Sequence, residues 1–276
     1  MKRMFALLAL IAFAFAAEAK KEKPVATIAL LSDPHVVHTN EHDGPYEKNF
    51  EKAITQVNKA NVDFVLITGD LSNGGKPDQL REFRYRTKKL SAPVYYVPGN
   101  HDVGHKFNSG KPTGTITIDT LKTYERVMGP SFFAKDEHGI RIIGVDSSLF
   151  GSGFQREREQ WKFLETELAK TNDTPKILFM HYPTFVTKAD EKGGGYWNIE
   201  PEQRQRLLDL CKRAKVKMIL SGHLHKALRN EYEGIPLVTT PAISFAFPRN
   251  KKLEGWTLIT LWKDREPTVE LKLLEK

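Results

Sequence analysis

The stretch VYYVPGNHD, residues 94–102, joins a short apolar run to a cluster of polar side chains. Residues 94–97 have the pattern of a buried strand, and Gly99-Asn100-His101-Asp102 follow directly after Pro98. The arrangement recurs at four other places: Asp33-Pro34-His35 follows the run Ala26–Leu31, Gly69-Asp70 follows residues 64–68, His181 follows residues 176–180, and Gly222-His223-Leu224-His225 follows residues 216–220. The carboxyl ends of parallel strands lie along one edge of a sheet. We therefore expect these clusters, which are far apart in sequence, to converge.

Helical patterns separate the apolar runs, over residues 46–59, 79–90, Ile118–Met128 and 155–170. Together with a further strand at residues 140–145, this alternation predicts successive βα units and a mainly parallel sheet. The strands expected at Ile235–Thr239, residues 256–261 and Thr268–Leu273 have no helix between them. They are predicted to form a second, more antiparallel sheet. Residues 103–115, rich in Gly, Lys and Pro, are predicted to be a loop and are a candidate substrate lid.

Composition indicates an ordinary folded protein. The chain has 276 residues, of which 40% are hydrophobic and 28% are charged, and it contains neither an internal repeat nor a long linker, so residues 20–276 are predicted to be one α/β domain. The formal charge of +8 favours anionic substrates. The basic residues are scattered, and the densest patch, residues 204–217, is typical of a solvated helix face, so no stable nucleic-acid partner is expected. Cys211 is the only cysteine, which excludes an intrachain disulfide.

The first 19 residues have the pattern of a signal peptide. Lys2 and Arg3 precede an apolar run from residue 5 to residue 17, and small residues at Ala17 and Ala19 predict cleavage after Ala19. The alternative is a retained membrane anchor, but about 13 apolar residues fall short of the roughly 20 that span a bilayer. We expect a periplasmic or secreted protein whose mature form has no membrane span.

The polar clusters offer carboxylates and imidazoles but no thiolate, which is a ligand set for a pair of Mn, Fe or Zn ions rather than for calcium. A carboxylate such as that of Asp70 has two oxygens and can bridge two ions. A single Asp or His at a strand end is usually a turn residue. The occurrence of five such clusters favours a metal site.

The order of these motifs resembles that of the calcineurin-like metallophosphoesterase superfamily, over essentially the whole chain after Lys23. Within it, the motifs Pro98–Gly104, Lys111-Pro112-Thr113, Tyr196-Trp197-Asn198 and Ser221-Gly222-His223 are similar to those of the calcineurin-like phosphoesterase domain-containing subgroup of protein-phosphatase type. The resemblance implies an α/β fold, specifically a four-layer α/β/β/α sandwich of two mixed β-sheets flanked by helices. Asn73 stands where purple acid phosphatases have a metal-binding tyrosine, so an Fe(III)-tyrosinate site is not expected.

The resemblance also implies a role for each motif residue. Asp33, His35 and His225 would hold the first metal, Asp70 would bridge, and Asn100, His181 and His223 would hold the second. His101 would lie above the phosphate to stabilise charge or to protonate the leaving oxygen, with Asp102 orienting its ring. A hydroxide held between the metals would attack phosphorus in line, without a covalent enzyme intermediate.

Four functions remain open on the sequence. The leading hypothesis is a phosphomonoesterase acting on a phosphoprotein or a small phosphate ester, and its nearest rival is a cyclic-nucleotide-type phosphodiesterase. A non-enzymatic metal-binding module is less favoured because no ligand is missing, and an extracellular nuclease lacks a contiguous basic groove. Selectivity is expected to come from the loops at residues 38–46 and 103–115. Outside the motifs, His38 and His42 either reach the substrate or are exposed to solvent in their loop, and the same alternatives apply to His105 in the candidate lid. Tyr182, Tyr196 and Trp197 either line the pocket or pack in the core or on the surface, and His138 has no assigned role.

Overall fold

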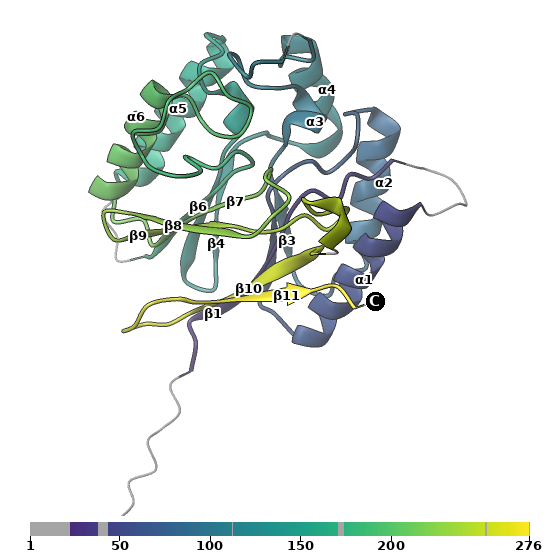
Figure 1. Ribbon diagram of the computed structural model, residues 1–276. Coiled ribbons are helices and arrows are strands. Elements are labelled where there is room, and N and C mark those ends of the chain that lie inside the picture. Colours follow the sequence, from purple (N-terminus) through teal and green to yellow (C-terminus); the bar gives the residue numbers. More distant parts are fainter. Residues whose placement is uncertain (1–22, 38–43, 112, 171–173, 252, 276) are drawn as a thin grey trace, which may run out of the picture.

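Two β-sheets lie face to face, with helices on the outer side of each (Figure 1). The structure is a computed structural model that describes residues 23–37, 44–111, 113–170, 174–251 and 253–275. The predicted signal peptide, His38 and His42 lie outside the described residues. The predicted four-layer α/β/β/α architecture is confirmed.

The first sheet has the strand order β11-β10-β1-β2-β3. Strands β1 (Ala26–Leu31), β2 (Phe64–Ile67) and β3 (Val94–Tyr96) are parallel, and helices α1 (Pro45–Ala60) and α2 (Pro77–Thr87) connect them. Helix α1 has a proline in its first turn and ends where Asn61 adopts a left-handed conformation with φ of 49°. Helices α3 (Asn100–Val103) and α4 (Ile118–Met128) follow β3. The βα units predicted for this half of the chain are present.

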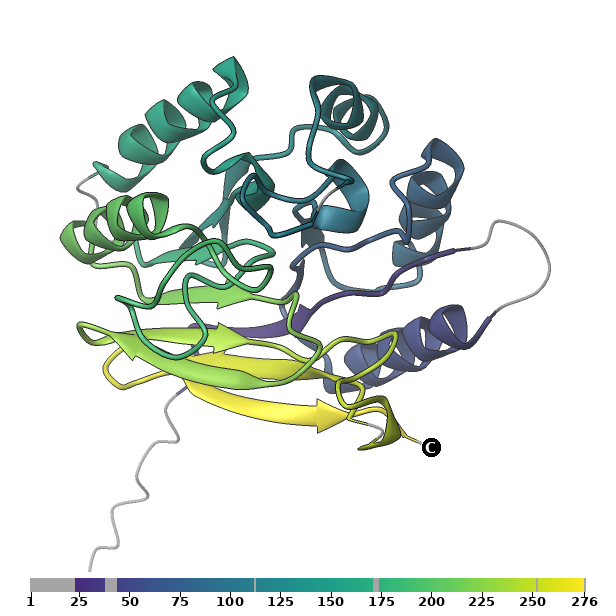
Figure 2. The same cartoon turned by 45° about the horizontal axis from the view of Figure 1, so that its top comes forward.

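The second sheet has the order β4-β5-β6-β7-β9-β8. Its inner strands β5 (Ile140–Gly144), β6 (Lys176–Phe179), β7 (Met218–Ser221) and β9 (Ile235–Thr239) are parallel. Helices α5 (Gln155–Leu168) and α6 (Pro201–Arg213) cover its outer face, on the opposite side of the molecule from α1 and α2 (Figure 2). Short 3-10 turns occur at Ser147–Leu149 and Arg249–Lys251.

Alternate residues of the inner strands face different layers. In β1, Ile28 packs into the core between the two sheets, whereas Ala29 packs into the core beneath α1, α2 and α4. In β6, Phe179 faces the core between the sheets and Leu178 faces the core beneath α5 and α6. Three apolar interfaces therefore hold the four layers together. None of the helices in the described ranges combines the length and apolar character needed to cross a bilayer.

The prediction that the last three strands form a separate sheet is wrong. Strand β9 joins the second sheet in parallel with β7, while β10 (Gly255–Leu261) and β11 (Thr268–Leu273) extend the first sheet, where β10 pairs antiparallel with β1. Figure 1 shows the yellow strands β10 and β11 beside β1. The alternation of side chains along a strand reports which face is buried but carries no information about the partner strand, which here lies more than 200 residues away.

Two strands were not predicted, β4 (Phe133–Glu137) and β8 (Leu228–Tyr232). Both are edge strands rich in charged residues, which weakens their apolar pattern. Each forms a hairpin through a two-residue turn whose residues both have positive φ, His138-Gly139 and Glu233-Gly234. That conformation matches the twist of a tight antiparallel hairpin.

Candidate metal centre

All seven predicted ligand residues come together where the carboxyl ends of strands from both sheets meet. Asp33 and His35 follow β1, Asp70 follows β2, Asn100 begins α3 after β3, His181 follows β6, and His223 and His225 follow β7. Every one of these residues is at most 5% exposed. The predicted convergence of distant segments is therefore present in the structure.

Much of the backbone at this site lies in the left-handed region of φ. The φ angles of Asp33, His35, Asp70, His223 and His225 are 53°, 47°, 49°, 69° and 52°. Residues other than glycine are uncommon there, and each such residue costs of order 1–3 kcal/mol. The surrounding sheets hold this strained geometry, and it aims the side chains inward from short loops.

Two glycines allow the loops to approach one another closely. A Cβ on Gly99 would lie 2.1 Å from the main-chain nitrogen of Asp70, and a Cβ on Gly222 would lie 1.7 Å from the Ser32 hydroxyl oxygen. A side chain at Gly99 would clash with the main chain of Asp70, and one at Gly222 would displace the side chains of Ser32 and Thr68. These glycines therefore set the spacing between the motif residues of different strands.

The first ligand cluster consists of Asp33, His35, Asp70 and His225. His225 Nε2 lies 3.2 Å from Asp33 Oδ1, and His35 Nε2 lies 3.5 Å from Asp70 Oδ2 and 3.3 Å from His225 Nε2. The ligand atoms of all four residues lie within 4.8 Å of one another. Such a set of two carboxylates and two imidazoles suits a divalent transition metal.

The second ligand cluster consists of Asp70, His181 and His223, with Asn100 beside it. His181 Nε2 lies 3.4 Å from Asp70 Oδ1, 3.0 Å from His223 Nδ1 and 3.0 Å from Asn100 Oδ1. The two carboxylate oxygens of Asp70 thus face different clusters. This is the arrangement that a bridging ligand requires.

Backbone carbonyls fix which ring nitrogen of each histidine faces the clusters. His181 Nδ1 donates to the Thr68 carbonyl at 2.8 Å, His223 Nε2 to that of Tyr196 at 2.9 Å, and His225 Nδ1 to that of Phe245 at 2.7 Å. The opposite nitrogen of each ring therefore presents a lone pair to the cluster. Such outer hydrogen bonds are usual for metal-binding histidines.

The residues present fit a pair of metal ions. With the tautomers fixed in this way, His181 Nε2 and His223 Nδ1 direct lone pairs toward each other across 3.0 Å, which is repulsive unless a cation lies between them. Asp33 Oδ1 is buried and has no hydrogen-bond partner among the described residues. A buried polar atom left in this state costs free energy, and a bound ion would satisfy it.

The electrostatics of the site keep most of its rings neutral. Burial, reinforced by neighbouring imidazoles, lowers the pKa of His35 to about 3 and that of His181 to about 4, although Asp33 opposes both shifts. Burial likewise holds the pKa of His223 well below its ordinary value. Burial and the charge of Asp33 raise the pKa of Asp70 well above its ordinary value. Neutral imidazoles are the form that binds metal, and a cation would restore ionisation of Asp70.

His101 lies beside the clusters, and its ring centroid is 4.6 Å from that of His35. Its Nδ1 is 2.9 Å from the Asn73 carbonyl oxygen, and its main-chain N–H donates to Asp70 Oδ1 at 2.8 Å. His101 is partly exposed and lines the cavity in front of the two ligand clusters.

The predicted role of Asp102 in orienting the His101 ring is wrong. The buried Asp102 carboxylate accepts hydrogen bonds from the main-chain N–H groups of Gly99, Leu71 and Ser72 and from the Ser72 hydroxyl. The Asn73 carbonyl orients the ring instead. Because residues 99–103 turn into the short helix α3, adjacent side chains diverge, and that of Asp102 points into the protein. Asp102 therefore positions the loop after β2 and does not contact the reacting groups.

An open cavity of about 510 Å³ lies over the clusters. Ser109, Gly110 and Lys111 of the predicted loop line one part of it, and the Lys111 Nζ lies 4.6 Å from the centre of the Tyr196 ring. The base of this loop is anchored by an ion pair between the buried Lys106 and Glu200. Pro112 lies outside the described residues. The loop contributes to the cavity wall, and its movement as a lid stays a prediction.

Four aromatic side chains form the remaining wall: Tyr196, Trp197, Phe245 and Phe247. The two phenylalanines were missed by sequence reasoning. They follow β9, whose carboxyl end lies at the same edge as those of β6 and β7. A prediction that places β9 in a different sheet cannot bring the loop after it to this edge.

The other candidate residues have different positions. Tyr182 is fully buried beneath the second cluster, with its ring centroid 4.3 Å from that of His223. His105 packs against Tyr196 at 5.3 Å between ring centroids, adjacent to the cavity. His138 lies 3.7 Å from Asp63, in the turn between β4 and β5 and remote from the clusters.

Comparison with known proteins places the chain in a family. The model of the calcineurin-like phosphoesterase family matches residues 26–227. The chain belongs to this family, and the resemblance inferred from its motifs is confirmed.

Individual relatives are more distant. Serine/threonine-protein phosphatase CPPED1 of Homo sapiens is 26% identical over 215 residues, which are 72% of this chain and 66% of that protein. The probable glycerophosphodiester phosphodiesterase GpdQ of Arcobacter nitrofigilis is 30% identical over 192 residues, which are 67% of this chain and 65% of that protein. The chain thus spans just under two thirds of the length of these curated relatives. A crystal structure of a dimetal phosphatase from Danio rerio shares the fold, with a TM-score of 0.61 at 14% identity over 92% of this chain and 98% of that chain.

Proposed function

We propose that this protein is a dinuclear-metal-dependent phosphoesterase that hydrolyses phosphate monoesters. The observation that carries the proposal is the position of Asp70, whose two carboxylate oxygens face two separate ligand clusters at the floor of an open cavity. Asp33, His35, Asp70 and His225 would hold one ion, and Asp70, Asn100, His181 and His223 the other. When bound, the ions would supply positive charge to the phosphoryl oxygens and activate a water as nucleophile.

His101 is the group we propose as proton donor to the leaving oxygen. Its Nδ1 is bonded to the Asn73 carbonyl, a contact that stabilises a proton on that nitrogen. The Nε2 atom is then the ring position available to donate a second proton. Because the ring is no part of either ligand cluster, it keeps the capacity for acid catalysis that a metal-bound imidazole lacks.

The preference for monoesters rests on charge. Lys111 brings a cation to the cavity at Tyr196, and a monoester carries about one more negative charge than a diester at neutral pH. The similarity to CPPED1, which is named a serine/threonine-protein phosphatase, supports the same proposal.

A phosphodiesterase is the second candidate, and one observation favours it. Trp197 and Phe247, at the mouth of the cavity, are 48% and 42% exposed, which leaves apolar surface for a second esterifying group. The similarity to GpdQ, named a probable glycerophosphodiester phosphodiesterase, agrees with this alternative.

Hydrolysis of three substrates separates these functions. Metal-stripped protein would be reconstituted with Mn²⁺ and assayed on p-nitrophenyl phosphate, bis-p-nitrophenyl phosphate and cyclic AMP, with His101→Ala as the control. Preference for the monoester supports the phosphatase, and preference for either diester supports the phosphodiesterase. Absence of metal-dependent turnover on all three would refute both and favour a non-enzymatic metal-binding module.

We also propose that the protein is exported and that residues 1–19 are removed. The support is the order of the basic, apolar and small residues at the N-terminus. N-terminal sequencing of native protein tests this, because an intact N-terminus would contradict it.

A further inference from the structure

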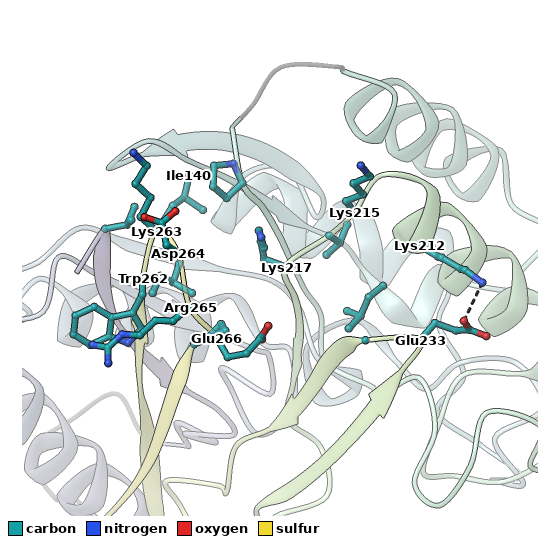
Figure 3. Close-up of a pocket in the computed structure, with 17 residues that line it drawn as sticks. Ile140, Lys212, Lys215, Lys217, Glu233, Trp262, Lys263, Asp264, Arg265 and Glu266 are labelled. Atoms are coloured by element: carbon teal, nitrogen blue, oxygen red, sulfur yellow. Dashed lines mark hydrogen bonds and ion pairs between the residues drawn. The ribbon is translucent and has the colours of Figure 1, made fainter. Parts of the chain in front are cut away.

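Figure 3 shows a second cavity. It lies at the end of the sandwich opposite the two ligand clusters. It has a volume of about 530 Å³ and is lined by residues at or just before the start of several strands, among them Val25 before β1, Ile140 in β5, Val216 before β7 and Ile235 in β9. The metal clusters follow the carboxyl ends of strands in the same two sheets. The two cavities are therefore separated by the length of the sheets. The volume is within the range of small-molecule sites.

The floor of this cavity is apolar. Ile140, Val216, Ile235 and Leu261 are at most 5% exposed and belong to the packed cores of the two sheets, and Val25 packs beside them. An apolar portion of a ligand would be removed from water here without disturbing a hydrogen bond. A purely ionic ligand would leave this surface unused.

The wall contributed by α6 and its turn into β7 is cationic. Lys212, Lys215 and Lys217 line it, and Lys212 is paired with Glu233 at 3.0 Å. The side chains of Lys215 and Lys217 make no hydrogen bond or ion pair with any residue that the structure describes. Figure 3 shows Lys217 between Lys215 and the turn between β10 and β11.

The opposite wall is the turn between β10 and β11, and it has mixed charge. Lys263 and Arg265 alternate there with Asp264 and Glu266. The Arg265 guanidinium covers the Trp262 ring at 3.5 Å from its centroid. Positive charges exceed negative ones around the whole cavity, with five cationic side chains against three anionic ones. On the wall formed by α6 and its turn into β7, the cations without a partner among the described residues are Lys215 and Lys217.

We propose that this cavity binds an amphipathic anion, with its apolar chain on the floor and its anionic head at Lys215 and Lys217. Charge complementarity selects the sign of the head group, and the buried aliphatic floor selects an apolar chain. The proposal is independent of the metal clusters and of the reaction they support.

The test uses dodecanoate as the probe, below its micelle-forming concentration, with isothermal titration calorimetry on the purified protein. Acetate, which lacks the chain, and dodecyltrimethylammonium, which reverses the charge, are the ligand controls. We expect saturable binding of dodecanoate alone. Lys217→Glu should weaken it at least tenfold, whereas Lys122→Glu, the same charge change at an exposed site on α4, should leave the affinity unchanged.

Tryptophan fluorescence locates the bound molecule. Trp262 lines this cavity and Trp197 lines the catalytic one, so each reports on a different site. A change on dodecanoate binding that is lost in Trp262→Phe and kept in Trp197→Phe supports the proposal. Absence of saturable binding, equal binding of the cationic amphiphile, equal effects of the two lysine substitutions, or a signal that depends on Trp197 would each overturn it.

Discussion

The substitution Asp102→Asn distinguishes two roles for this carboxylate, which are positioning the loop after β2 and orienting the His101 ring. Asp102 accepts four hydrogen bonds, from three main-chain N–H groups and one hydroxyl, at 2.8–3.0 Å. An asparagine has almost the same shape, but its amide nitrogen cannot accept. If the amide nitrogen replaces Oδ1, the main-chain N–H of Ser72 loses its acceptor. If it replaces Oδ2, the main-chain N–H groups of Leu71 and Gly99 lose theirs.

The cost follows from the hydrogen bonds that change. A buried donor left without an acceptor costs about 1–3 kcal/mol, and each remaining bond loses about 1 kcal/mol because the acceptor is no longer charged. The free energy of unfolding should therefore fall by about 3–5 kcal/mol, out of about 5–15 for a typical domain.

Urea unfolding at pH 7.5 measures this loss, with Asp264→Asn, an exposed carboxylate in a turn, as the matched control. The control should change stability by less than about 0.5 kcal/mol. If Asp102→Asn were to keep stability within about 1 kcal/mol of the native protein while losing turnover, the positioning role would be refuted and a role in orienting the His101 ring restored.

Two further predictions concern the scaffold. Burial raises the pKa of Asp146 to about 8, so the folded protein binds a proton at this group between about pH 4 and pH 8 that the unfolded chain releases. The stability that this bound proton contributes is complete below the unfolded pKa and is lost as the pH rises toward 8, with a slope of up to about 1.4 kcal/mol per pH unit. Asp146→Asn should therefore flatten the decline of the urea unfolding midpoint between pH 5 and pH 8. An unchanged decline would exclude Asp146 as the source of the pH dependence. Gly222→Ala places a Cβ 1.7 Å from the Ser32 hydroxyl oxygen and should lower the free energy of unfolding by about 1–3 kcal/mol and weaken metal binding. Gly195→Ala, where a Cβ meets nothing within 4 Å, is its control. Equal thermal midpoints for the two variants would show that the Ser32 side chain can move aside without cost.

The ligand residues could be predicted from sequence because each lies within a few residues of the carboxyl end of a strand. Asp33, Asp70 and His181 need only the rule that parallel strands share a carboxyl edge, and the structure brings them together. The strained left-handed backbone at Asp33 and Asp70 has no sequence signal of its own. It depends on contacts between loops from different strands.

The role of Asp102 could not be predicted because adjacency in sequence does not determine side-chain direction. Its hydrogen-bond partners Leu71 and Ser72 lie about 30 residues away, on the loop after β2. The position of Phe245 was missed for a related reason. It depends on β9 joining the second sheet, and long-range strand pairing is not encoded in local periodicity.

The fold shows the same division between local and long-range information. The helix at Ile118–Met128 and the strand at Ala26–Leu31 were predicted with the bounds they have in the structure, because their patterns are local. The change of sheet after β3 and the return of β10 to pair with β1 were not. The pairing of β10 covers the edge of β1 that β2 leaves open, a requirement that appears only once the sheet is assembled.

The most direct test of the central claim is the metal stoichiometry of the protein and of Asp70→Asn. Each would be reconstituted with Mn²⁺, passed through a desalting column and analysed by inductively coupled plasma mass spectrometry, with circular dichroism to verify folding. The shared carboxylate predicts close to two ions per chain in the native protein and at most one in the folded variant. Two ions retained by Asp70→Asn, or none bound by the native protein, would contradict a dinuclear centre bridged by Asp70.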